Sequence, residues 1–334
     1  MQIGVLPRRK LLRLMAAAAA TWPIAGHAQQ RERTKRVAVL TALPADDAVI
    51  KMRLNVLLEE LAHLGWSPGQ NLTMDYRFGA GQSDRYPALA QDLVAARPDA
   101  IIAHTTQVAI AVQRATRDIP VVFFDVSDPI GSGFIASLAR PSGNMTGVLL
   151  YEAGIVGKWL ALLREIAPHV TRAALLGNPK TTAFSYFQRA AEAAAPSIPI
   201  ELVAAPVGND AEIEYEFQSL ASVPNGGLVV LPDPTNVSHR ERIIALAAHH
   251  YLPAVYPFRL FTAAGGLMAY ETDQRDVSRL AAAYIDRILR GAKPGDLPVQ
   301  VPTKYATVVN LKAGRAIGLE VPPSLLVRAD EVIE

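Results

Sequence analysis

The sequence has 334 residues, of which 50% are hydrophobic and 19% are charged, and it contains no cysteine. Disulfide bonds, thiolate metal sites, cysteine nucleophiles and a lipid-modified cysteine anchor are therefore excluded. The formal net charge is +2, but the first 28 residues carry four basic and no acidic side chains, so the rest of the chain carries −2 and no basic stripe suited to nucleic acid.

The first 28 residues have the composition of a targeting signal. A basic start, Arg8-Arg9-Lys10, precedes an apolar run over residues 11–20, and small residues lead up to Ala28. This run is far shorter than the ~20 residues of a membrane-spanning helix. We expect export to the periplasm with cleavage after Ala28. The paired arginines favour the twin-arginine route, while general secretion, an uncleaved anchor and an unstructured tail stay open.

In the first half of the chain, apolar runs alternate with helical patterns. The runs at 37–40, 100–103 and 121–124 contain no charged residue and predict strands buried on both faces. Leucines at helical spacing over 54–61 predict a helix that ends at Gly65. The order strand, helix, strand, helix, strand predicts a parallel sheet with helices on both faces.

The same pattern restarts in the second half. After a helix over 156–163, apolar strands are expected at 173–176, 228–231 and 253–256, whereas 199–203 alternates in polarity and is expected nearer a sheet edge. These runs predict a second half-sheet, with a join near 147–154. Two domains also agree with the length, which exceeds what one hydrophobic core usually supports.

Three further elements follow the second series. A strand is expected at 267–270, a helix over 277–288 and a last strand near 306–309. They indicate that the chain passes back between the two domains. The sequence has no low-complexity linker, which favours several short crossovers over one tether.

Polar side chains follow many of the predicted strands directly. Ligands of parallel α/β sheets bind beyond the carboxyl ends of the strands, so these positions are the candidates for ligand contacts. Thr105 and Thr106 also stand at a helix start, where free N–H groups and the helix dipole favour an anion such as a ligand carboxylate. Simple N-capping is the alternative reading of both threonines. The candidates from this rule are Thr41, Thr105, Thr106, Asp125, Asn178, Asp233 and Tyr256.

The other candidates have alternative readings as well. Asp125 and Asp233 can accept hydrogen bonds from a ligand amine or hydroxyl. Turn formation is the alternative, because Asp125 lies just before Asp128-Pro129 and Asp233 stands before Pro234, where it can also cap the helix that follows. Tyr256 can stack on a ligand ring, or it can be an ordinary half-buried tyrosine.

Signatures of catalysis are missing from the sequence. It contains no G-x-S-x-G elbow, no phosphate loop and no H-E-x-x-H. His249 and His250 are adjacent on a predicted helix and should point to different sides of it, which argues against a shared metal ion. We therefore predict no catalytic residue, no metal and no cofactor.

Several motifs together resemble one known family. The chain resembles the ABC transporter substrate-binding proteins of the tryptophan/tyrosine type, which have the type I periplasmic-binding-protein fold, over essentially its whole length. The motifs are ARPSGNMTG at 139–147, LPDP at 231–234, YPFR at 256–259, AGGLM at 264–268, PTKY at 302–305 and the tail over 321–333.

This resemblance implies two Rossmann-like parallel-sheet lobes joined by three crossovers, with the ligand between the lobes. The crossovers would lie near 146–150, 268–271 and 303–307. The first lobe would comprise 36–148 with 269–303, and the second 149–268 with 304–334. The family's function would be to bind a small carboxylate-bearing ligand, an amino acid or a related acid, by hinge closure and to deliver it to an ABC permease in the inner membrane. Such proteins are usually monomers.

The chain departs from the family at two positions expected in the cleft. Glu271-Thr272-Asp273 stands where relatives commonly have glycine and proline, and Thr235-Asn236 stands where they often have apolar residues. Both departures indicate a more polar ligand than an aromatic amino acid. Glu271 is therefore a candidate ligand contact, or else a hinge residue that faces solvent. An exported sensing subunit, an exported enzyme on the same fold and a regulator core remain alternative functions.

Overall fold

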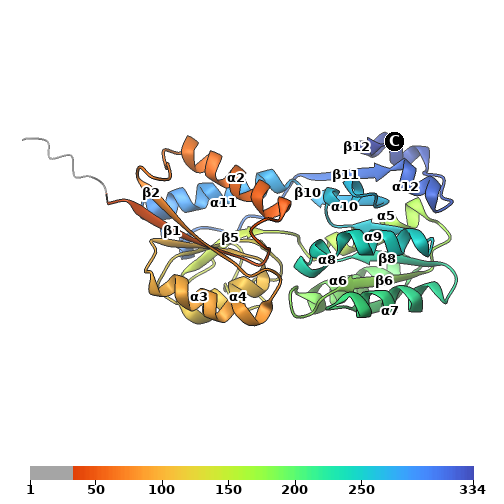
Figure 1. Ribbon diagram of the computed structural model, residues 1–334, viewed down its shortest axis with the longest axis horizontal. Coiled ribbons are helices and arrows are strands. Elements are labelled where there is room, and N and C mark those ends of the chain that lie inside the picture. The colour runs from red at the N-terminus through yellow and green to blue at the C-terminus, as the bar shows by residue number, and fades with distance from the viewer. Residues whose placement is uncertain (1–32) are drawn as a thin grey trace, which may run out of the picture. The chain divides into compact units, whose positions relative to one another are not determined.

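The computed structural model describes residues 33–334, so the targeting signal expected at residues 1–28 lies outside the described residues. Within the described chain, Lys35–Glu334 forms one unit. This unit contains the two sheets that the sequence predicted: the first is entirely parallel, and the second is parallel except for one pair of strands (Figure 1).

The first sheet has five parallel strands in the order β2-β1-β3-β4-β5. Its inner strands are apolar because helices cover both faces, and residues 37–40 and 100–103 have no exposed surface. The strands are β1 (Lys35–Thr41), β2 (Leu72–Phe78), β3 (Ala100–His104), β4 (Val121–Val126) and β5 (Met145–Leu149). The sequence patterns did not predict β2 and β5.

Two pairs of helices cover this sheet. α2 (Ala48–His63) packs against α11 (Gln274–Leu289) on one face, and α3 (Tyr86–Ala95) packs against α4 (Thr106–Ala115) on the other (Figure 1). Although α11 comes late in the chain, it contacts β3, β4 and β5. We call this sheet with its four helices the first lobe.

The second sheet has seven strands in the order β12-β11-β10-β9-β8-β6-β7. All neighbours pair in parallel except β10 and β11, which are antiparallel. β7 is an edge strand, which confirms the expectation for residues 199–203. The strands are β6 (Arg172–Gly177), β7 (Glu201–Pro206), β8 (Gly226–Val230), β9 (Ala254–Tyr256), β10 (Met268–Thr272), β11 (Tyr305–Asn310) and β12 (Glu331–Ile333).

The helices around this sheet complete the second lobe. α5 packs against α6, and α7 packs against α9. The helices are α5 (Ile155–Ile166), α6 (Phe184–Ala194), α7 (Asp210–Ala221), α8 (Pro234–Ser238), α9 (Arg240–His249), α10 (Arg259–Ala263), α12 (Leu311–Ala316) and α13 (Pro323–Arg328). Short 3-10 turns lie at Ser83–Arg85, Ala195–Ser197 and Pro294–Asp296. None of the helices in residues 33–334 combines the length and apolar character that crossing a membrane requires.

Three crossovers join the lobes, as expected from the resemblance. The first lies between β5 and α5, the second between β10 and α11, and the third leads into β11. Because β10 runs to Thr272 within the second sheet, the return to the first lobe starts at Asp273 rather than at residue 269. Before the third crossover, Gln300 pairs with Val148 beside β5.

Candidate functional site

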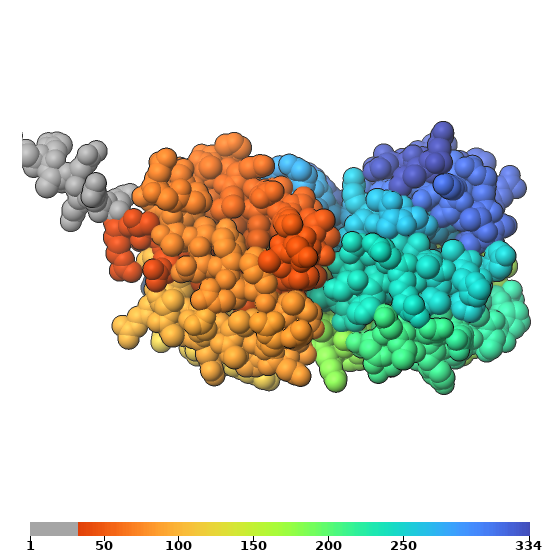
Figure 2. Space-filling model, in the orientation of Figure 1, coloured from red at the N-terminus to blue at the C-terminus, as the bar shows by residue number. Residues whose placement is uncertain are grey.

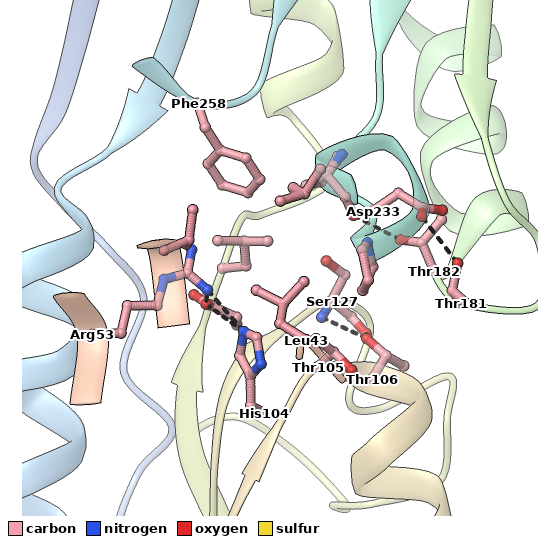
Figure 3. Close-up of a pocket in the computed structure, with 16 residues that line it drawn as sticks. Leu43, Arg53, His104, Thr105, Thr106, Ser127, Thr181, Thr182, Asp233 and Phe258 are labelled. Carbon is pink, nitrogen blue, oxygen red and sulfur yellow. Dashed lines mark hydrogen bonds and ion pairs between the residues drawn. The ribbon is translucent and has the colours of Figure 1, made fainter. Parts of the chain in front are cut away.

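A small cavity of about 30 Å³ lies where the two lobes meet, beyond the carboxyl ends of the strands (Figure 3). In the space-filling view the residues of the two lobes touch along a seam (Figure 2). The first lobe and its crossover contribute Leu43, Val49, Arg53, His104, Thr105, Thr106, Asp125, Ser127 and Leu150, and the second lobe contributes Thr181, Thr182, Pro232, Asp233, Pro234, Val237 and Phe258.

Thr105 joins β3 to α4 in a strained backbone conformation. Its φ of 83° and ψ of 157° lie in a region that is essentially reserved for glycine, and such strain concentrates at functional sites. Its Oγ1 is buried without a hydrogen-bond partner and does not cap α4. The first N–H groups of α4 have no partner within the helix, so this corner of the cavity favours an anion.

Asp125 lies at the end of β4, where the pairing with β5 shifts register between Phe123 and Val126. An irregularity of this kind re-aims side chains at sheet ends. Asp125 has a φ of 56°, and its Oδ2 is paired with Arg53. Its Oδ1 is buried and has no partner. The carboxylate can therefore accept another hydrogen bond.

Arg53 is a buried cation on α2, with only 4% of its surface exposed. One terminal nitrogen pairs with Asp125 and the other donates to Gln274 Oε1 at the start of α11. Its guanidinium also lies 5.7 Å from the centre of the Phe258 ring, which belongs to the second lobe. Burial lowers the pKa of Arg53 to about 10, so the side chain stays charged at neutral pH.

His104 connects this ion pair to β1. Its Nε2 lies 2.8 Å from Arg53 Nη1, and its Nδ1 lies 2.7 Å from Thr41 Oγ1. Burial, together with the nearby Arg53, lowers the pKa of His104 well below its usual value, so the ring is neutral. His104 Nε2 also lies 3.2 Å from Asp125 Oδ2, so the ring contacts both members of the ion pair. Thr41 does not line the cavity, but it orients His104.

Asp233 organises the wall formed by the second lobe. Its carboxylate caps α8 through the N–H groups of Thr235 and Asn236, and it also accepts from Asn178 N and Thr181 Oγ1. Despite these four donors, burial raises the pKa of Asp233 to about 6. Asp233 thus has the capping role that was one of its two expected roles.

The side chains of Asn178 and Thr106 are both used in hydrogen bonds within the protein. Asn178 does not line the cavity; its Nδ2 donates to Thr235 Oγ1 and its Oδ1 accepts from Lys180 N. Thr106 lines the cavity, but its hydroxyl donates to Ser127 O at 3.1 Å and accepts from Ser127 N at 3.0 Å. Both side chains hold neighbouring loops in place.

Two expected residues lie elsewhere. Tyr256 is buried in the second lobe, stacked on Phe261 with 4.9 Å between ring centres, and Phe258 two residues later reaches the cavity instead. Glu271 does not face solvent, since only 3% of it is exposed. It accepts from Arg259 N at 2.8 Å and pairs with the Arg259 side chain, and burial raises its pKa.

Several residues of the site were not predicted. His104 directly follows the strand predicted at 100–103 and is the last residue of β3, so the rule that selected Thr105 could have selected it. Arg53 shares the buried face of α2 with Ile50 and Leu57, and a charge on such a face is itself a signal. Thr181, Thr182 and Phe258 of the lining were not predicted either, nor was Gln274, which binds Arg53. Within residues 33–334, no group of three or more histidines and carboxylates is placed to hold a metal ion.

Two lobes of parallel sheet, three crossovers and a polar cavity between the lobes define a type I periplasmic binding protein. The chain belongs to the ABC transporter substrate binding protein family, whose model matches residues 36–333.

Known relatives agree with this assignment. A tyrosine-binding protein of Clostridioides difficile is 23% identical over 266 residues, covering 79% of this chain and 75% of the relative. A conserved domain protein of Vibrio cholerae is 27% identical with a TM-score of 0.84, and an ABC domain of Streptococcus pneumoniae in complex with L-Trp is 24% identical with a TM-score of 0.83. Both structures cover 90% of this chain and are covered completely.

Proposed function

We propose that the chain is the substrate-binding component of an ABC importer and that it holds an amino acid or a related acid between its lobes. The observation that carries the proposal is a pair of buried oxygens without partners, Thr105 Oγ1 and Asp125 Oδ1. A hydroxyl can donate to a carboxylate, and a carboxylate can accept from an ammonium group. The two oxygens therefore match the two charged ends of an α-amino acid. The tyrosine-binding relative and the complex with L-Trp support this ligand class.

Each wall has a distinct task in this proposal. Thr105 and the first N–H groups of α4 bind the carboxylate, Asp125 binds the ammonium group, and Phe258 packs on the body of the ligand. Thr41, Thr106, Asn178 and Asp233 hold these groups or their loops in position. Glu271 acts at the hinge instead of on the ligand.

Ligand entry requires the lobes to separate. The cavity of about 30 Å³ is much smaller than the ~300 Å³ at the lower end of ligand pockets. The second crossover is suited to act as a hinge because it is anchored on both sides: Glu271 pairs with Arg259 in the second lobe, and Gln274 accepts from Arg53 in the first. Rotation about Thr272 and Asp273 between these anchors would open and close the cleft.

The proposal also covers where the protein works and to which partner it delivers its ligand. The N-terminal signal directs the protein to the periplasm, where it works as a monomer and delivers its ligand unchanged to a permease of the inner membrane. Neither catalysis nor a cofactor is required for this task.

The test is a binding measurement on protein that has been unfolded and refolded to remove any co-purified ligand. L-Tyrosine and L-tryptophan are titrated by calorimetry and by thermal unfolding. Ligand at 100 times its dissociation constant should raise the free energy of unfolding by about 2.7 kcal/mol. Mass spectrometry of the released compound should show it unchanged.

Matched compounds and variants make this test specific. Tyramine lacks the carboxylate and 3-(4-hydroxyphenyl)propionate lacks the ammonium group, so both should bind far more weakly than tyrosine. Thr105→Ala should weaken tyrosine binding, whereas Thr73→Ala, at an exposed position on β2, should not. Equal binding of tyramine and tyrosine, or no binding of any amino acid by correctly refolded protein, would refute the proposal.

A further inference from the structure

Gln274 lies where the second crossover enters the first lobe. It is the first residue of α11, and only 9% of its surface is exposed. Its Nε2 donates to Thr272 Oγ1 at 2.8 Å and to Thr272 O at 3.2 Å, and its Oε1 accepts from Arg53. Thr272 is the last residue of β10 in the second lobe, whereas Arg53 belongs to α2 in the first. The two ends of the Gln274 amide are therefore bonded to different lobes.

Arg53 extends this connection to the cavity. Its Nη2 binds Gln274, while its Nη1 binds Asp125 Oδ2. The other oxygen of Asp125, Oδ1, is the one that has no partner. A continuous series of buried polar contacts thus runs from the ammonium site of the proposed function to Thr272 at the hinge. In surroundings of low dielectric constant, a change at one end of such a series alters the bonds along it.

The residues on either side of Thr272 are held within single lobes. Glu271 accepts from Arg259 N and pairs with the Arg259 side chain in the second lobe. Asp273 caps α11 in the first lobe. These contacts can persist while the lobes rotate. The bonds between Gln274 and Thr272 span the backbone about which the rotation takes place, so they depend on the angle between the lobes.

A ligand ammonium group would change the forces on Arg53. Asp125 alone balances the Arg53 charge in the buried pair. A second cation at Asp125 Oδ1 shares this carboxylate and repels the guanidinium, so Arg53 depends more on its other partners. One is Gln274, and the other is the Phe258 ring of the second lobe, whose centre lies 5.7 Å from the guanidinium (Figure 3). Because the contact with Phe258 joins the two lobes, a stronger contact favours the closed state.

We infer that Gln274 is a positioning residue that couples ligand binding to closure of the lobes. The ammonium group binds Asp125 and thereby strengthens the bond between Arg53 and Gln274. Gln274 in turn holds Thr272 in the closed conformation of the hinge. This inference rests on the proposed function, because it assigns a control of closure to the same site. Gln274 does not touch the ligand and acts through Arg53.

The test measures closure as a distance between two spin labels. The chain has no cysteine, so Gln91→Cys on α3 and Ser219→Cys on α7, both at exposed positions, provide the only two attachment points. Double electron–electron resonance gives the ratio of closed to open molecules, without ligand and with saturating L-tyrosine, or L-tryptophan if it binds more tightly.

The decisive variant is Gln274→Met, which keeps the length of the side chain and removes its hydrogen bonds. The ratio of closed to open molecules at saturating ligand should fall about tenfold, because a hydrogen bond to a charged group is worth at least that factor. Without ligand the ratio should change less than about twofold, since only the ligand shifts Arg53 towards Gln274. A merely structural role would change both ratios equally.

Three further variants guard against misfolding and indirect effects. Thr272→Val removes the hydroxyl that accepts from Gln274, so it should give the same pattern from the other side of the hinge. Thr272→Ser retains the hydroxyl and should restore ligand-induced closure. Gln113→Met is the matched control, because Gln113 is also a buried glutamine of the first lobe, donates to Gly133 O and does not line the cavity. It should leave both ratios unchanged.

The outcomes separate this inference from the proposed function. If the ligand closes Gln274→Met and Thr272→Val as fully as the unmodified protein, the inference is wrong while the proposed function stands. Equal losses of closure with and without ligand also overturn it. If correctly refolded, unmodified protein binds no amino acid at all, both fail together.

Discussion

On the first-lobe wall of the cavity, Thr105 and Asp125 have positive φ angles and each has a buried oxygen without a partner. On the second-lobe wall, Asp233 accepts four hydrogen bonds, and none of the lining side chains has a buried polar atom that lacks a partner. Among the residues that line the cavity, positive φ angles and buried oxygens without a partner are thus confined to the first-lobe wall. This difference supports the proposal that the first lobe binds the charged groups of the ligand. The second lobe would then be a lid, a wall whose hydrogen bonds are already complete and which closes over the ligand.

The largest expected effect concerns the buried ion pair behind the first-lobe wall. Asp125→Asn leaves the charge of Arg53 buried without a counter-charge, which should lower the free energy of unfolding by about 3 to 5 kcal/mol. Asparagine tolerates positive φ, so the backbone should be little affected. Urea-induced unfolding of the full chain measures the change.

The matched control for this variant is Asp92→Asn. Asp92 pairs with Arg77 at the surface, and its side chain is 57% exposed. A pair of this kind is worth about 0 to 1 kcal/mol. If both variants lose the same stability, the Arg53–Asp125 pair does not support the first-lobe wall as described.

The second effect is a pH dependence of the second-lobe wall. The pKa of Asp233 rises from 3.8 to about 6 on folding, so the folded state binds its proton more tightly than the unfolded state. The resulting stability is present in full below pH 4 and is lost as the pH rises through 6. The stability of the unmodified protein relative to Asp233→Asn should therefore increase by about 2 kcal/mol between pH 7 and pH 4.

Unfolding curves at several pH values test this expectation. The same series with Asp92→Asn provides the reference for a carboxylate at the surface. Parallel pH profiles for the unmodified protein and Asp233→Asn would mean that the hydrogen bonds to Asp233 offset its burial, and the lid would be equally stable across this range.

Much of the fold could be predicted from sequence because buried parallel strands leave an uninterrupted apolar signal. The runs at 37–40 and 228–231 are examples, and both form inner strands. β2 was missed because it is an edge strand with polar and partly exposed residues, and β12 because it is a short, largely exposed edge strand. The return of the chain to the first lobe was predicted, but the packing of α11 against α2 is a tertiary contact that no local pattern encodes.

The residues of the site that follow strand ends could be predicted, whereas those on helices could not. The rule for strand ends found Thr105, Asp125 and Asp233. It also selected Tyr256, whose ring points into the second-lobe core, because the rule gives a position and not a direction. Arg53 lies on α2 and Gln274 on α11, 221 positions later in the chain. The hydrogen bond between them is a product of tertiary structure.

The smallest effect tests whether strain at Thr105 serves binding. Glycine adopts a φ of 83° without steric cost, so Thr105→Gly should raise the free energy of unfolding by about 1 kcal/mol, the relief of strain exceeding the entropy that glycine loses on folding. The same variant should weaken amino acid binding about fivefold, since the loss of one hydrogen bond costs about 1 kcal/mol.

Thr105→Ala removes the hydroxyl but keeps Cβ, so it should weaken binding to the same extent without the gain in stability. A Thr105→Gly variant that is stabilised and still binds normally would show that the strained backbone is unrelated to the ligand, and the contrast between the two walls would lose its functional meaning.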